Sequence, residues 1–260
     1  MFINFKNIGI ECVEFSYRYI DYIETVRFAE KAGHYAEMAA ETGIGLWSVH
    51  LPFGNELDIS TLNDYDRALT VSVHKKLIRA AGEAGMKTVV LHPSAEPINE
   101  NKRAERLKRS RENILALAEC CDKYALNLAV ENLPRTCLCN ASGEMLELLA
   151  GTGATACFDV NHPLMEDAVL FINSIFCGGL AVSTLHISDY DFVNERHWLP
   201  GEGVIDWPKT VNALEKNNYN GPLMYEISFQ HKNGNRVTLD EMAENQRWLA
   251  HINQNDNRNR

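Results

Sequence analysis

The sequence predicts an α/β protein of the (β/α)8 TIM-barrel class, for three reasons. Short apolar runs alternate with helical segments at spacings of about 30 residues, the size of one strand–helix–strand unit. The runs are almost continuously apolar, as expected of parallel strands that are buried on both faces. The length of 260 residues is close to the roughly 250 that one barrel needs. We therefore expect a single domain over residues 1–252, followed by a polar tail over residues 253–260.

Seven segments have the composition of strands. β-branched and other apolar residues predominate in them, and two of them stop at a His-Pro or His-Leu-Pro sequence. The expected strands are residues 7–15, 46–52, 88–92, 127–132, 156–160, 182–187 and 223–227.

Seven further segments have the periodicity of helices, with apolar residues recurring every three or four positions. We expect the first of them to be broken near Gly33. The expected helices are residues 17–42, 64–84, 103–124, 143–149, 164–176, 207–216 and 239–252. A closed barrel has eight strands, one more than we count, and residues 1–5 are too few for a strand and a helix.

Six of the seven expected strands end in a side chain that can bind a metal. The C-terminal ends of parallel barrel strands all meet at one face, so these side chains converge although they lie far apart in the sequence. A lone strand-end histidine is more often a hydrogen-bonded core residue, but buried carboxylates almost always have a partner or a cation. Three carboxylates beside three imidazoles therefore indicate a metal. The six residues are His50, His92, Glu131, Asp159, His186 and Glu226.

Four consecutive strands supply the core of this predicted site, namely Glu131, Asp159, His186 and Glu226. Three oxygen ligands and one nitrogen suit a divalent ion, Mn²⁺, Mg²⁺ or Co²⁺, with Zn²⁺ as an alternative.

Other polar residues surround that core. The stretch 185–203 alone contains two histidines and four carboxylates. We expect the surrounding residues to be further metal ligands, partners of the ligands, or donors to a substrate. Arg135 could meet a substrate carboxylate or phosphate, although a surface arginine is the commoner case. The other surrounding residues are His50, His92, His162, Glu195 and His197.

Composition argues against several classes of partner. A formal net charge of −10 and a pI near 5.4 disfavour nucleic acid and anionic membranes, which are bound by clustered Lys and Arg. No apolar run reaches the ~20 residues of a membrane span. Seven cysteines, an odd number without a secretory signal, are typical of reduced thiols in a cytoplasmic protein. The pair Cys137 and Cys139 has no second pair to complete a metal site, so we expect it to be structural.

The strand-end residues lie in short motifs that resemble the xylose isomerase-like TIM-barrel superfamily. This superfamily contains sugar-phosphate isomerases and epimerases together with the apurinic-site endonucleases. The motifs follow the family's order over nearly the whole chain, and they specify fold and metal site more strongly than substrate. They are V-H-L-P-F at 49–53, V-V-L-H-P at 89–93, V-E-N at 130–132, F-D-V-N-H at 158–162, L-H-I-S-D at 185–189, R-H-W-L-P-G-E-G at 196–203 and Y-E-I at 225–227.

The resemblance implies two sets of roles. In the epimerases, the positions of the four core residues hold a single metal, and those of Glu131 and Glu226 also exchange the substrate proton. In the endonucleases a three-metal cluster occupies the same face. Its extra ligands would match His50, His92, His162 and His197, with Glu195 in place of an aspartate. The charge of −10 and the sequence E-I-S, where the nucleases usually have E-T-P, argue against the nuclease.

The motifs align residues 10–15, I-E-C-V-E-F, with the second strand of the family. The first βα unit is then missing. We expect a barrel that is open at its N-terminal edge or closed there by another subunit, or a start site assigned too far downstream.

The leading hypothesis is a metal-dependent sugar or sugar-phosphate isomerase or epimerase. It would transfer a proton next to a carbonyl through a metal-stabilised enediolate, with Glu131 and Glu226 as acid and base. The alternatives are a multi-metal phosphodiester hydrolase of the apurinic-site endonuclease type, a polyol dehydratase, and a binding protein without turnover. The expected partner is a small sugar or sugar phosphate, and a homo-oligomer is compatible with the open edge.

Overall fold

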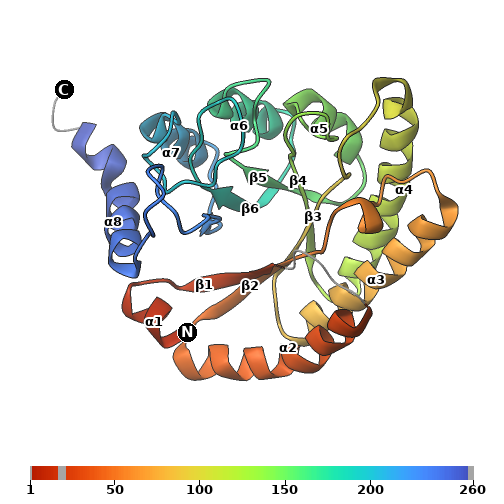
Figure 1. The fold of residues 1–260 in the computed structure, drawn as a ribbon, viewed down its shortest axis with the longest axis horizontal. Helices are drawn as coiled ribbons and strands as arrows, with labels where there is room; N and C mark the ends of the chain where they lie inside the picture. Colours follow the sequence, from red (N-terminus) through yellow and green to blue (C-terminus); the bar gives the residue numbers. More distant parts are fainter. Residues whose placement is uncertain (1, 17–21, 257–260) are drawn as a thin grey trace.

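The computed structural model describes residues 2–16 and 22–256 of the chain. Seven parallel strands form one sheet in the order β1-β2-β3-β4-β5-β6-β7. The sheet curls into a barrel with the helices around its outside (Figure 1). The predicted TIM-barrel class is confirmed, and the described residues include no full eighth βα unit.

The strands are three to six residues long, and together they form the barrel wall. All four residues of β3 are buried, as expected of a strand with its neighbours on both sides and helices behind it. The strands are β1 Cys12–Ser16, β2 Gly45–His50, β3 Thr88–Leu91, β4 Asn127–Glu131, β5 Thr155–Asp159, β6 Val182–Ile187 and β7 Leu223–Tyr225.

A helix follows every strand, and α1 precedes the first one. Local capping fixes several helix starts: Asn63 and Asp167 accept backbone N–H bonds at the beginnings of α3 and α6. In the described part of the chain, no helix has the length and apolar character needed to cross a membrane. The α-helices are α1 Phe2–Asn7, α2 Tyr22–Thr42, α3 Asp64–Glu83, α4 Arg103–Asp122, α5 Ser142–Leu149, α6 Ala168–Cys177, α7 Trp207–Lys216 and α8 Leu239–Asp256, with short 3-10 helices η1 Asn55–Leu57 and η2 Glu100–Lys102.

Alternate strand residues divide between the barrel interior and the helices. Val90, Ala129 and Cys157, on three neighbouring strands, form a small buried cluster apart from the main core. Side chains two residues apart share a face of a strand, so Glu131 and Asp159 lie on the same face as this cluster, at the strand ends. The interior of the barrel thus places an apolar floor beneath the polar strand-end residues.

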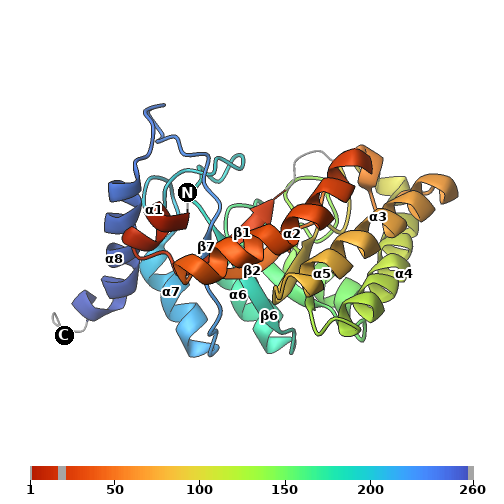
Figure 2. The same ribbon diagram turned by 90° about the horizontal axis from the view of Figure 1, so that it is seen from below.

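The barrel is open between β1 and β7, the two edges of the sheet. A cavity of about 500 Å³ occupies this opening and is lined mainly by apolar side chains, including Phe2 and Phe5 of α1 and Leu249 of α8. Figure 2 shows α1 and α8 close together at this side of the barrel. Glu14 of β1 and Glu226, the residue after β7, also line the cavity. The prediction of an open N-terminal edge is confirmed for the described residues.

The structure corrects several predicted element bounds. Residues 22–42 form one helix without a break at Gly33, since a glycine costs a helix interior only about 1 kcal/mol and tertiary packing can outweigh that. Residues 17–21 of that predicted helix lie outside the described residues. The first strand begins at Cys12 rather than residue 7, because residues 2–7 form α1. Helix α8 continues to Asp256, within the expected tail.

We predict that Gly82→Ala destabilises the fold, because Gly82 lies where α3 packs against Tyr124. A Cβ atom at position 82 would lie 2.6 Å from the Cβ of Tyr124, which its own backbone fixes in place. Overpacking of this kind typically lowers the free energy of unfolding by about 1–3 kcal/mol. Urea denaturation of the variant and the parent protein measures the difference.

Gly33→Ala is the matched control. No atom lies within 4 Å of a Cβ at position 33, which is in the interior of α2. Alanine there should raise the free energy of unfolding by about 0.5–1 kcal/mol through helix propensity alone. Equal stability of the two variants would contradict the close approach of Tyr124 to α3.

Candidate metal centre

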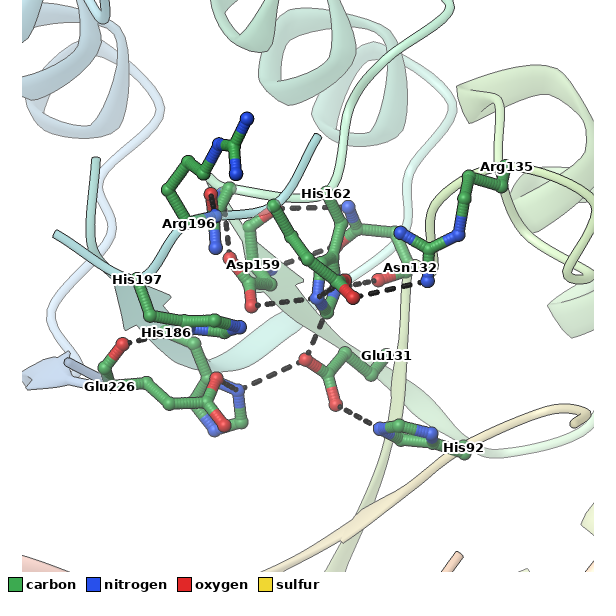
Figure 3. Close-up of polar contacts among 12 residues, drawn as sticks. His92, Glu131, Asn132, Arg135, Asp159, His162, His186, Arg196, His197 and Glu226 are labelled. Carbon is green, nitrogen blue, oxygen red and sulfur yellow. Dashed lines mark hydrogen bonds and ion pairs between the residues drawn. The ribbon is translucent and has the colours of Figure 1, made fainter. Parts of the chain in front are cut away.

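The C-terminal ends of the strands bring the four predicted core ligands together. Glu131 and Asp159 are the last residues of β4 and β5, His186 is the second last of β6, and Glu226 directly follows β7. Figure 3 shows these side chains gathered at one end of the strands. One ligand atom from each residue lies within 4.8 Å of those from the others. The geometry is therefore suitable for a single ion.

His186 is the centre of this group. Its Nδ1 lies 3.1 Å from Glu131 Oε1 and 3.1 Å from Glu226 Oε2. The side chains of His186, Glu131 and Asp159 are at most 1% exposed, whereas that of Glu226 is 37% exposed. Three residues thus form a buried floor, and Glu226 borders the solvent.

Two further predicted residues contact the other oxygen of Glu131. The Nε2 atoms of His50 and His92 lie 3.0 Å and 3.1 Å from Glu131 Oε2. His50, Glu131 and His186 form a second group that could hold an ion. His92 is more peripheral, and its ring stacks on Phe53 with the centroids 4.0 Å apart.

His162, Glu195 and His197 form a third group of ligand atoms, in the loops that follow β5 and β6. His162 Nε2 lies 3.3 Å from Glu195 Oε2 and 3.4 Å from Asp159 Oδ2. His162 therefore connects the outer group with the four core residues. The structure brings all nine predicted His, Asp and Glu residues to one face of the barrel, and their individual roles stay predictions.

Three of the histidines are oriented in the same way. His50, His162 and His197 each donate the Nδ1 hydrogen to a backbone carbonyl. A carbonyl can only accept, so Nδ1 carries the hydrogen and Nε2 remains as the nitrogen that can bind an ion. In His50 and His162, Nε2 also contacts a carboxylate. This is how proteins commonly orient an imidazole that binds a metal. The acceptors are the carbonyl oxygens of Leu51, Asn132 and Glu226, at 2.8, 2.8 and 3.0 Å.

Asn132 fixes the position of Asp159. Its Oδ1 accepts the Asp159 N–H at 2.8 Å, and its Nδ2 donates to the Asp159 carbonyl at 2.9 Å. Asp159 Oδ1 in turn accepts the N–H of Asn161 at 2.6 Å. The protein thus occupies one carboxylate oxygen of Asp159 and leaves Oδ2 without a hydrogen bond.

Unpaired oxygens show that the site fits a cation. Asp159 Oδ2 and Glu226 Oε2 are both buried atoms without a hydrogen-bond partner. A buried carboxylate oxygen without a partner is unfavourable by several kcal/mol unless a positive charge compensates it. Together with Glu131 and His186 they form an oxygen-rich ligand set, which suits Mn²⁺, Mg²⁺, Co²⁺ or Zn²⁺.

The histidines and carboxylates of the site shift one another's pKa values. Burial alone would lower the pKa of His162, but Asp159 and Glu195 outweigh burial and raise it to about 10. Burial raises the pKa of Asp159 to about 7. Burial would also raise the pKa of Glu131, but three neighbouring imidazoles outweigh it and hold this pKa well below its usual range. An ion that binds here must therefore displace protons.

A second cavity, of about 300 Å³, opens above the site and is lined by residues of all three groups. Among the residues that the structure describes, Arg135 is the one lysine or arginine that lines it. The guanidinium is occupied, because Nε lies 2.9 Å from Glu96 Oε2 and Nη2 lies 3.0 Å from Glu195 Oε1. Arg135 thus belongs to the cavity wall, with its charge balanced by two carboxylates.

Asp189 organises the loop between β6 and α7 and does not join the site. It is fully buried, and its Oδ2 accepts hydrogen bonds from Gly201 N at 2.8 Å and Trp207 Nε1 at 2.9 Å. A Cβ at Gly203 would lie 2.2 Å from Asp189 Oδ1, so this position requires glycine. The loop built in this way carries Glu195 into the third group.

The sequence analysis missed one acidic residue at the site, Glu14 of β1. Glu14 Oε1 lies 3.0 Å from His186 Nε2, and Oε2 accepts a hydrogen bond from Ser48 Oγ at 2.5 Å. The signal was the two-residue period of the strand, since Phe15 packs outward against Tyr35 of α2 and Glu14 must then face inward. Glu14 is not a strand-end residue, because β1 continues for two more residues to Ser16.

Comparison with known proteins gives a match to one family model over nearly the whole chain. The model describes the xylose isomerase-like TIM barrel and matches residues 2–252. The uncharacterized protein MJ1311 of Methanocaldococcus jannaschii is 26% identical over 194 residues, which are 71% of this chain and 64% of that protein. The chain therefore spans less than two thirds of the length of that relative.

Two solved structures share the fold at low sequence identity. A D-tagatose 3-epimerase-like protein has a TM-score of 0.78 at 19% identity, covering 95% of this chain and 90% of that chain. The D-psicose 3-epimerase of Clostridium cellulolyticum H10, solved with D-tagatose, has a TM-score of 0.76 at 16% identity, covering 97% and 91%. With the model matched from residue 2 to residue 252, the chain belongs to the xylose isomerase-like TIM-barrel family.

Proposed function

We propose that the protein isomerises or epimerises a keto-sugar by moving a proton at a carbon next to the carbonyl group. The observation that carries the proposal is the placement of Glu131 and Glu226, each 3.1 Å from His186 Nδ1 (Figure 3). They reach this point from different strands, β4 and the end of β7. Two carboxylates that approach one substrate from different directions can remove a proton and return it elsewhere. The epimerase names of the two similar structures support this reaction class.

We assign the proton transfers to the two glutamates, one as general base and the other as general acid. Glu226 is the more exposed, so it can exchange its proton with water between turnovers. His162 lines the cavity and can orient a substrate hydroxyl. A divalent ion, when bound, would stabilise the negative charge that develops on the substrate oxygen. The residues that would hold it are Glu131, Asp159, His186 and Glu226.

The cavity favours a substrate without a phosphate group. Phosphate recognition normally uses a free arginine or lysine, or a set of free backbone N–H groups. Arg135, the one arginine among the described residues of the cavity wall, already pairs with Glu96 and Glu195. A dianionic phosphate would have to compete with both carboxylates for it. A neutral monosaccharide encounters no such conflict.

The test is deuterium exchange into unmodified and phosphorylated ketoses. The Mn²⁺-loaded protein is incubated in D₂O with ketopentoses, ketohexoses and their phosphates, and proton NMR follows the C–H signals next to the carbonyl. We expect exchange and a new sugar for at least one neutral ketose. Absence of exchange with every ketose would contradict the proposed reaction. Exchange confined to the phosphates would contradict only the choice of a neutral substrate.

We predict that Glu131→Gln and Glu226→Gln each lower the turnover rate by roughly 10²–10⁴-fold, the usual contribution of a general acid or base. Initial rates on the best ketose from the exchange screen measure the effect. Glu119→Gln removes an exposed charge from the outside of α4 and serves as control. Full turnover by either active-site variant would show that its carboxylate does not transfer the proton.

We predict that removal of divalent ions by a chelator abolishes turnover and lowers the melting temperature. An ion at 100 times its dissociation constant stabilises the folded state by about 2.7 kcal/mol, which is roughly 5 °C for a domain of this size. Calorimetry before and after addition of Mn²⁺ to the chelator-treated protein measures the shift. An unchanged melting temperature at saturating Mn²⁺, Mg²⁺, Co²⁺ and Zn²⁺ would argue against ion binding.

The chelator-treated protein should become less stable as the pH rises from about 6.5 to about 10. The pKa of His162 is raised to about 10 in the folded state, so the fold binds this proton more tightly than the unfolded chain does. The stability that it contributes is complete below the unfolded pKa of about 6.5 and is lost as the pH approaches 10. Urea midpoints at several pH values measure the slope. His162→Gln should flatten it, and an equal slope in the variant would assign the effect to other groups.

A second candidate function is hydrolysis of a phosphodiester at several metal ions. The overlapping ligand groups favour it, since His162, Glu195 and His197 form a set beside the core site. The net charge of −10 disfavours it, because nucleic-acid binding needs an excess of cations. Elemental analysis and an abasic DNA duplex separate the candidates. Two or three ions per chain with strand cleavage would establish hydrolysis, and one ion without cleavage would exclude it.

A further inference from the structure

His186 is oriented differently from the other histidines of the site. His50, His162 and His197 donate Nδ1–H to a backbone carbonyl, which leaves Nε2 as their potential ligand atom. His186 faces the cluster through Nδ1, and its Nε2 points to the opposite side of the ring. That nitrogen is buried, and the atom at hydrogen-bonding distance from it is Glu14 Oε1, at 3.0 Å.

Glu14 reaches His186 because of an irregularity in the first strand pair. The parallel register shifts between Val13 and Glu14, so Val13 is opposite Leu46 but Glu14 is opposite Ser48. Bulges of this kind occur often beside active sites, where they redirect a side chain. The shift lets Ser48 Oγ donate to Glu14 Oε2 at 2.5 Å and leaves Oε1 for the histidine.

The environment of Glu14 gives its carboxylate no other strong partner. Its side chain is only 9% exposed, and within residues 2–16 and 22–256 its ion-pair contact is with His186. Burial of a carboxylate is unfavourable unless charged or hydrogen-bonding groups compensate it. The Ser48 hydroxyl on one oxygen and an imidazole nitrogen 3.0 Å from the other can provide that compensation. The carboxylate of Glu14 and the ring of His186 therefore stabilise each other in their buried positions.

We propose that Glu14, held by Ser48, is a positioning residue that accepts the Nε2 hydrogen of His186 and so presents the Nδ1 lone pair to the ion. This inference rests on the metal-dependent function proposed above. A carboxylate behind a metal-binding histidine fixes the tautomer and raises the basicity of the ring. Glu14 would accept the hydrogen of the ring nitrogen that does not bind the ion. Backbone carbonyls accept the corresponding hydrogen of the other three histidines. The distance of 3.0 Å suits this bond, although Nε2 has no hydrogen bond in the orientation that the two side chains have here.

Cys157 is the competing neighbour of His186. Its thiol lies in the small apolar cluster of the barrel interior. The thiol is fully buried among apolar neighbours. A neutral thiol is a weak acceptor, whereas a carboxylate accepts strongly. Glu14 is therefore the group that decides which ring nitrogen carries the hydrogen.

The first measurement is Co²⁺ affinity by competition with a chelating dye. We expect Glu14→Leu to weaken binding roughly 10- to 100-fold, the usual effect of losing such a partner. Glu14→Gln should recover part of the loss, since its amide oxygen can accept the same hydrogen. Ser48→Ala should lose less than Glu14→Leu. Glu11→Leu, an exposed acidic residue just before β1, and Cys157→Ala should bind like the parent protein. Circular dichroism and melting temperatures of the ion-free variants verify that each is folded.

The second measurement reads the tautomer itself. In the Zn²⁺-loaded, ¹⁵N-histidine-labelled protein, long-range ¹H–¹⁵N correlation should show His186 protonated at Nε2 and coordinated through Nδ1. Glu14→Leu should shift or remove this Nε2–H signal, an effect that lost packing alone does not produce. Coordination through Nε2 would overturn the proposal.

The outcomes separate this proposal from the proposed function. If Glu14→Leu binds Co²⁺ as tightly as the parent protein while the parent turns over ketoses, Glu14 has no positioning role and the function stands. If the parent binds Co²⁺ through Nδ1 of His186, Glu14→Leu weakens it, and no ketose reacts, the function fails and the role of Glu14 stands. If the parent binds no divalent ion, both are overturned.

Discussion

The constraint on which the site depends is the burial of several carboxylates at the end of one barrel. Glu131 and Asp159 are almost inaccessible to solvent and lie beside Glu226, where like charges repel and water cannot screen them. Imidazoles and bound protons in the site compensate this negative charge. Imidazoles surround Glu131, the pKa of Asp159 is raised to about 7, and that of His162 to about 10. A divalent ion would compensate the same negative charge in place of the protons.

The open edge of the barrel bears directly on this charge balance. A strand at the edge of a sheet has a neighbour on one side only, and β1 pairs with β2 alone among the described strands. It nevertheless supplies Glu14, which lies beneath the cluster and contacts His186. The cavity between β1 and β7 is bordered by this residue and by Glu226. With seven strands among the described residues, an apolar opening lies beside the site, and all four core residues are still present.

The wall of the upper cavity is neutralised by its own pairs. Arg135 joins Glu96 to Glu195, and Glu195 contacts His162, so one chain of charges links the rim to the core site. The loop that carries Glu195 is held by the buried carboxylate of Asp189. These pairs balance the charge of Arg135, so the described part of this wall has no uncompensated arginine that could attract a polyanion.

The sequence by itself determined the architecture and which residues gather at the candidate site, because both follow from local patterns. Continuous apolar runs define parallel strands, and a polar residue that ends such a run, as Glu131 and Asp159 do, must lie at the common face of the barrel. Only the tertiary structure decided the partner of each group, since a partner lies tens of residues away and depends on register and loop path. A register shift brings Glu14 to His186, and a folded loop turns Asp189 away from the site. Packing likewise kept α2 continuous through Gly33, where local propensity alone predicted a break.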